Sequence, residues 1–202
     1  LSGNVYNLYF DVILFSPGCT LIFISTLFAV LLIFRNESIV RVRSVIYGIV
    51  FSNIILVFLS YISLEQILTD NYSTNTAFLA EIFNFDISLF FSGIVLLYLD
   101  MIFIIFVYRY LYFKFPKNYF IQFIGASTVT AVFDSISFYT LNFYSEINYL
   151  ELMLGNVVGK VFVSIVLSIL FAFYLLVNPQ KERKRKELKD IFTIINFTSD
   201  KR

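Results

Sequence analysis

Long apolar stretches separated by short polar segments make up most of this chain. About 20 apolar residues are needed to cross the hydrocarbon core of a bilayer as a helix. Five stretches are close to that length or longer, at Gly18–Phe34, Val45–Leu64, Ile82–Tyr108, Tyr119–Phe143 and Leu152–Val177. The pattern predicts an all-α fold, a polytopic transmembrane helix bundle with five spans, in which Ser16-Pro17-Gly18 begins the first helix.

Basic residues follow every second span. Arg35, Arg41 and Arg43 come after the first, Arg109, Lys114 and Lys117 after the third, and eight more between Lys181 and Arg202 after the fifth. The alternate connections hold acids and no Lys or Arg. Cytoplasmic loops carry the excess of positive charge. We therefore expect a multi-pass protein of the inner (plasma) membrane with its C-terminus in the cytoplasm.

Composition agrees with a membrane protein and narrows the chemistry. Apolar residues make up 59% and charged residues 14% of the 202, and the mean hydropathy is +0.82. Soluble domains contain about one quarter charged residues. The chain has no His and a single cysteine, Cys19, and it lacks a glycine-rich phosphate loop or a metal-ligand cluster. We expect no enzyme activity, no cofactor, no metal site and no nucleic-acid partner; the lipid bilayer is its surroundings.

Asp134 is the most informative residue, because it lies near the middle of the fourth apolar span. A carboxylate in hydrocarbon costs a few kcal/mol and needs a partner or a water-filled cavity. Lys160, in the fifth span, is the only cation outside the polar flanks. Both lie roughly 12–13 Å from the outer helix ends, at 1.5 Å of rise per residue. The spacing predicts that they meet.

Polar residues extend the helix faces that carry this pair. Ser127 and Thr130 share the face of Asp134, and Asn156, Ser164 and Ser168 recur at steps of four with Lys160. Two interpretations stay open. The pair fixes the helix register, or it recognises a ligand or ion in a pocket between helices.

Other residues add candidates of lower specificity. Asn53 is a polar residue of the second span, otherwise expected to hydrogen-bond between helices. Asp100 in the third span is expected about 12 Å from the inner helix end, away from Lys160 in depth. It would be protonated, bonded to Tyr or Ser, or paired with Arg109. The small-residue motif Gly155-x-x-x-Gly159 favours close helix approach and suggests a homodimer.

The chain divides into a membrane bundle over residues 1–179 and a basic tail over 180–202. Within the tail, Leu188, Ile191, Phe192 and Ile195 fall at helical spacing. Such an amphipathic helix lies on the membrane surface or connects to a cytoplasmic signalling domain beyond Arg202.

The order of several motifs resembles the VUT family, assigned to the transport of queuosine precursors. The motifs are Phe15-Ser16-Pro17-Gly18, then Val45-Ile46-Tyr47-Gly48 leading into Asn53, then Gly125-Ala126-Ser127 leading to Asp134, and the late Lys160. This resemblance implies six helices, so that one further helix would precede the first span. It also implies import of the deazapurine bases preQ0 and preQ1, which are small heterocyclic ligands.

The chain also departs from that family. Leu27–Phe34 is wholly apolar where the family carries an acid, and Ala131 stands where the family has glutamine. The bundle and its basic tail resemble the N-terminal membrane domains of bacterial receptors. The sequence therefore favours a ligand-sensing input domain, with a pocket lined by Asp134, Lys160, Asn156, Ser127, Asn53 and Asp100. The alternatives are an importer of a queuosine precursor and a membrane anchor that only dimerises.

Overall fold

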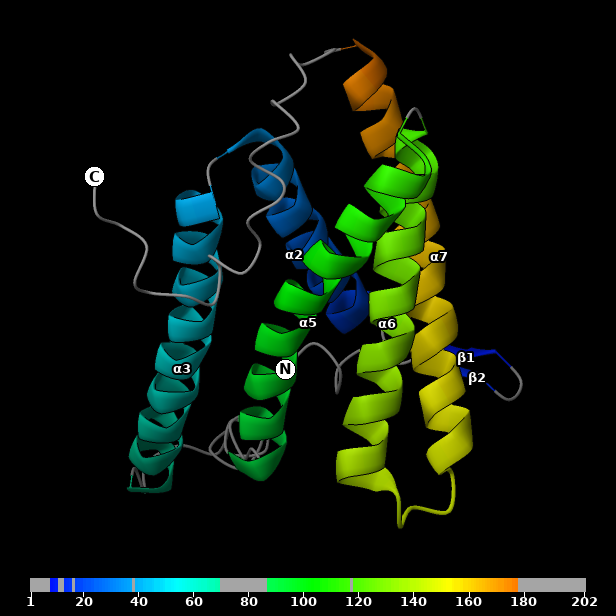
Figure 1. The fold of residues 1–202 in the computed structure, drawn as a ribbon. Coiled ribbons are helices and arrows are strands. Elements are labelled where there is room, and N and C mark those ends of the chain that lie inside the picture. The colour runs from blue at the N-terminus through cyan, green and yellow to red at the C-terminus, as the bar shows by residue number, and fades with distance from the viewer. Residues whose placement is uncertain are drawn as a thin grey trace.

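The computed structural model describes residues 8–10, 13–15, 17–37, 39–69, 87–116 and 118–177. Five helices dominate this part of the chain (Figure 1), and a small hairpin precedes them. The helices are α2 (Pro17–Asn36), α3 (Ile39–Thr69), α5 (Ile87–Lys114), α6 (Tyr119–Phe143) and α7 (Tyr149–Val177). The tail predicted over 180–202 and Asp86 lie outside the described residues.

The helical membrane bundle expected from the sequence is confirmed. Four helices, α3, α5, α6 and α7, are long and apolar enough to cross a membrane, and α2 contributes a shorter apolar helix. The bounds of α6 coincide with the predicted fourth span. Asn118 explains the sharp start of α6, because its side-chain oxygen accepts a hydrogen bond from the Ile121 amide at 3.1 Å.

Helices α3 and α5 extend further beyond their apolar stretches than the other helices do. Helix α3 begins at Ile39 rather than Val45, so Arg41 and Arg43 lie in helix and not in a loop. An ion pair between Arg41 and Glu37, one turn apart, holds this end. Helix α5 continues to Lys114, past the predicted end at Tyr108. Charged side chains can end an apolar run without ending a helix, since their stems lie along it and their heads reach water.

A β-hairpin precedes α2 and was not predicted from the sequence. Strand β1 (Leu8–Phe10) pairs antiparallel with β2 (Ile13–Phe15), and Leu8 lies opposite Phe15. The hairpin packs beside α7, on the side of the bundle away from α3 (Figure 1). Strands of three residues carry too little alternation of apolar and polar positions to be recognised.

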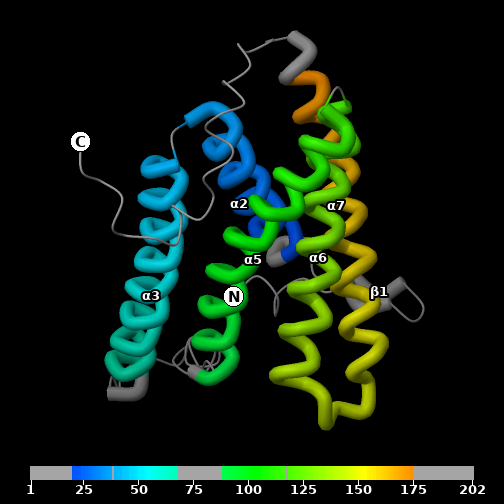
Figure 2. The backbone as a smooth tube through the Cα atoms, in the orientation of Figure 1, coloured from blue at the N-terminus to red at the C-terminus, as the bar shows by residue number. Residues whose placement is uncertain are grey.

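Helix α6 is central to the bundle. It packs most extensively against α5 and α7, whereas α3 lies at the edge and contacts mainly α2 and α5 (Figure 2). The C-terminal ends of α2, α5 and α7 and the N-terminal ends of α3 and α6 lie together at one end of the bundle (Figure 1). The basic residues at these helix ends therefore gather on one side, as the charge pattern required; they are Arg35, Arg41, Arg43, Arg109 and Lys114.

An aromatic cluster fills the core toward the same end. Phe123 of α6 is fully buried, and its ring centroid lies 4.6 Å from Phe171 of α7, 5.2 Å from Tyr108 of α5 and 5.9 Å from Phe28 of α2. One side chain thus joins four helices. Because lipid is as apolar as these rings, close packing rather than exclusion from water must stabilise this contact.

Candidate functional site

Asp134 and Lys160 form a buried ion pair, as the sequence predicted. The Lys160 ammonium group donates to Oδ2 of Asp134, joining α7 to α6. Only 6% of Asp134 and 7% of Lys160 is exposed. The ammonium group also lies 4.3 Å from the ring centroid of Phe23 on α2, a cation–π contact. Lys160 therefore links three helices.

Asp100 joins Asp134 and Lys160 in one charged cluster, although the sequence had placed it apart from them. It is fully buried on α5, close enough to the Asp134 carboxyl group and to Lys160 to interact electrostatically with both. The expectation that Asp100 lies at another depth was wrong. Because α5 runs on to Lys114, Asp100 is about 21 Å from that helix end at 1.5 Å per residue, not about 12 Å.

The two oxygens of Asp100 have no hydrogen-bond donor among the described residues. A carboxylate only accepts hydrogen bonds, so Asp134 can bond to Asp100 only if a proton sits between the two groups. With both acids ionised, the cluster of Asp100, Asp134 and Lys160 would carry one net negative charge. Such a charge is costly in a membrane interior unless a proton or a cationic group neutralises it.

Buried hydroxyl groups lie next to the charged cluster. Asp134 of α6 contacts Lys160 of α7, and Phe123 of α6 contacts Phe171 of α7. The spacing between the two contacts is the same on both helices. This antiparallel register places Thr130 opposite Ser164, one turn from the ion pair. Both residues are fully buried, and their hydroxyls, like that of Ser168, lack a partner within the described ranges. These hydroxyls are available to water or to a ligand.

Ser127 and Asn156 make hydrogen bonds inside the bundle, and their contact with a ligand stays a prediction. The hydroxyl of Ser127 donates to the backbone oxygen of Phe123 at 2.8 Å, so its hydrogen is taken up within α6. The Asn156 oxygen accepts from Ser135 at 3.0 Å, and its amide lies 3.5 Å from the hydroxyl of Tyr139. Asn156 therefore fastens α7 to α6 one turn from Lys160.

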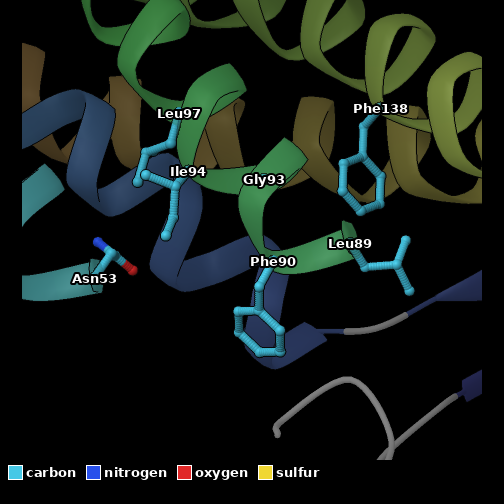
Figure 3. A pocket seen from close by; sticks show the side chains of 7 residues that line it. All are labelled: Asn53, Leu89, Phe90, Gly93, Ile94, Leu97 and Phe138. Carbon is cyan, nitrogen blue, oxygen red and sulfur yellow. The ribbon is translucent and has the colours of Figure 1, made fainter. Parts of the chain in front are cut away.

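Asn53 lies in a separate cavity of about 350 Å³ at the edge of α3. The other lining residues come from α5 and α6 (Figure 3); they are Leu89, Phe90, Gly93, Ile94, Leu97 and Phe138. The structure does not bring Asn53 to the ion pair. However, Leu97 and Phe138 are each one turn from the buried acids, Asp100 and Asp134 respectively. The sequence shows that Leu97 lies three residues before Asp100 and Phe138 four residues after Asp134. It does not show that both side chains line a cavity.

Gly155 and Gly159 are both buried inside the single chain. The close approach that this motif permits is therefore used within the bundle. The homodimer expected through these glycines stays a prediction. Among the described residues, no group of three or more His, Cys, Asp or Glu side chains is placed to hold a metal ion.

Comparison with known protein families decides the family. Residues 1–175 match the family described as vitamin uptake-like sensor. The chain belongs to this family. The match covers the hairpin and the helices up to the last turn of α7, including all three residues of the charged cluster.

Family membership confirms the resemblance drawn from the motifs at the level of a VUT-like sensor membrane domain. The chain is thus a sensor- or transport-related, multi-pass helical membrane domain. No curated protein and no solved structure matches the chain.

Proposed function

We propose that this domain senses a small molecule that binds at the cluster of Asp100, Asp134 and Lys160. The observation that carries the proposal is the Asp100 carboxyl group, which is fully buried and has no donor partner in the described part of the chain. A purely structural ion pair would need only one acid for one lysine. Intramembrane ionisable residues are expensive and usually mark binding sites or pathways.

The family description and the position of the cluster support a role in sensing. The three residues come from α5, α6 and α7, and Lys160 contacts α2 through Phe23. A ligand that exchanges one of these contacts would change how four helices pack. Because packed interfaces have discrete arrangements, such an exchange can be transmitted to the helix ends. The receiver would be a cytoplasmic domain beyond Arg202.

The ligand proposed here is a planar nitrogen heterocycle. Its ring N–H groups would donate to the carboxyl oxygens, and phenylalanine or tyrosine rings would stack on its faces. Nothing in this scheme requires a bond to be made or broken, in keeping with our expectation that the domain is not an enzyme.

Binding to the full chain in lipid nanodiscs tests the proposal. We expect at least micromolar affinity for one member of a panel containing adenine, guanine, preQ0 and preQ1, measured by calorimetry. Asp134→Asn should abolish that binding. Glu151→Gln, which changes an exposed acid of α7, should not alter it. Failure of every base to bind to the folded protein would refute this ligand class.

Transport of the same ligand is the alternative, favoured by the resemblance to the VUT family. Proteoliposomes distinguish the two functions, because an importer accumulates the labelled base inside the vesicle and a sensor only binds it. Uptake that requires Asp134 would replace sensing by transport as the function.

Orientation in the membrane is a further part of the proposal. We place the end of the bundle that carries Arg35, Arg41, Arg43, Arg109 and Lys114 in the cytoplasm, together with the C-terminus. Alkaline phosphatase fused after Arg202 should be inactive, and green fluorescent protein at the same position should fluoresce. The reverse result would invert the topology.

A further inference from the structure

Asp100 of the charged cluster is closed to solvent, and a cavity is lined by residues one helical turn away from the two acids. Asp100 has no exposed surface, whereas Asp134 and Lys160 keep 6% and 7%. The cavity of about 350 Å³ ends at Leu97 of α5 and Phe138 of α6. Each of these residues is one helical turn from a buried acid, about 4.5–6 Å along the helix axis. The nearest lining residues of the cavity are therefore one helical turn from the cluster.

The lining of the cavity suits an apolar ring. Asn53 is the one polar side chain among the lining residues, and its amide already donates to the backbone oxygen of Ile49 at 2.9 Å. Gly93 leaves room opposite Phe138, since a Cβ atom there would lie 3.9 Å from that ring. A volume of this size is within the range of small-molecule sites.

The charge of the cluster indicates which chemical group of the ligand would bind there. The cluster holds two carboxyl groups and one ammonium group, and Lys160 is already engaged by Asp134. A second cationic group would neutralise the remaining carboxylate and donate hydrogen bonds to the unpartnered oxygens of Asp100. With a neutral ligand, a bound proton would have to neutralise the remaining carboxylate.

We propose that the ligand is a small organic cation with an aromatic body, the ring in the cavity beside Gly93 and the ammonium group on Asp100. This inference rests on the proposed sensing site, and in place of a neutral heterocycle bound by its ring N–H groups it gives that site a cationic ligand whose ring lies in the cavity. The ammonium group reaches Asp100 between Leu97 and Phe138, so a ring and a chain of about two carbons match the one-turn distance. Phe138 must turn aside for the chain to pass.

The test compares matched cations and alcohols on the full chain in nanodiscs. The probes are 2-phenylethylamine and tryptamine, with 2-phenylethanol and tryptophol as their uncharged counterparts. We expect each amine to bind at least tenfold more tightly than its alcohol. Asp100→Asn should remove that ratio, because an amide does not attract a cation as a carboxylate does. Equal affinities of amine and alcohol for the natural chain would overturn the inference.

Two glycine variants test the cavity separately from the charge. Gly93→Leu should fill the space beside Phe138 and weaken amine and alcohol alike by at least tenfold. Gly48→Leu, at a glycine of α3 that has open space around it and does not line the cavity, should bind as the natural chain does and controls for the loss of a helical glycine. Unchanged amine affinity in a folded Gly93→Leu protein would place the ring elsewhere and overturn this part.

The outcome also separates the inference from the proposed function. If the neutral bases adenine, guanine and preQ0 bind in a manner that needs Asp134 and the amines do not bind, the sensing site stands and the cationic ligand class is wrong. If neither group of compounds binds to the folded chain, both fail.

Discussion

Lys160→Met is expected to destabilise the bundle far more than Asp134→Asn, although the two residues form one ion pair. Without Lys160, two neighbouring buried carboxyl groups lose the cation that faces them within the described part of the chain. Breaking a buried pair by removing one partner costs about 3–5 kcal/mol, and a second acid places this case at the upper end. In Asp134→Asn, Lys160 retains Asp100 within electrostatic reach, so we expect a loss below about 2 kcal/mol.

Unfolding free energies in mixed micelles titrated with SDS measure this asymmetry. Equal losses for the two single replacements would mean that Asp100 does not substitute for Asp134. The double replacement, Asp134→Asn with Lys160→Met, should recover only part of the loss, because Asp100 still lacks Lys160 but no longer neighbours a second carboxylate. If the carboxylate also recognises a ligand, this double variant will fold and still fail to bind. A double variant that keeps full function would leave the pair with a structural role only.

Phe123→Ala should give the second largest loss of stability. The Phe123 ring is fully buried and contacts Phe28, Tyr108 and Phe171 on three other helices. Phe→Ala in a water-soluble core costs about 3–5 kcal/mol, part of it for transfer from water. Lipid removes most of the transfer part, so we expect on the order of 2–3 kcal/mol from lost packing.

Phe162→Ala is the matched control, since 63% of Phe162 is exposed on α7. Its ring would exchange protein surface for lipid with almost no change in packing, and SDS titration should detect a loss below about 0.5 kcal/mol. Similar losses at Phe123 and Phe162 would show that burial in this bundle does not stabilise it through packing.

The helices were readable from the sequence because length and hydropathy alone decide which stretches can cross a bilayer. Helix α6 was predicted with its observed bounds, since Asn118 and the polar residues after Phe143 limit an apolar run at both ends. Helices α3 and α5 were underestimated, because Arg41 and Lys114 lie in helix beyond the apolar stretch. The hairpin of Leu8–Phe10 and Ile13–Phe15 gave no recognisable pattern.

The candidate site was only partly readable. Asp134 and Lys160 could be paired because they lie on consecutive antiparallel helices at equal depth. Asp100 could not be added to them, because its depth depended on where α5 ends. Asn53 and Ser127 were grouped with the pair from polarity alone. Polarity alone does not show where a side chain points. Asn53 lines a cavity and Ser127 bonds to the backbone of its own helix.

The sequence by itself determined that this chain is a helical membrane bundle, which helices compose it, and that one acid and one lysine meet inside. Each of these follows from local hydropathy and from the cost of charge in lipid. Only the tertiary structure decided that Asp100 lies beside Asp134 and Lys160, and that Leu97 and Phe138, each one turn from a buried acid, line a cavity. Those facts depend on helix tilt and rotation, which are set by packing between helices rather than by the residues of one helix.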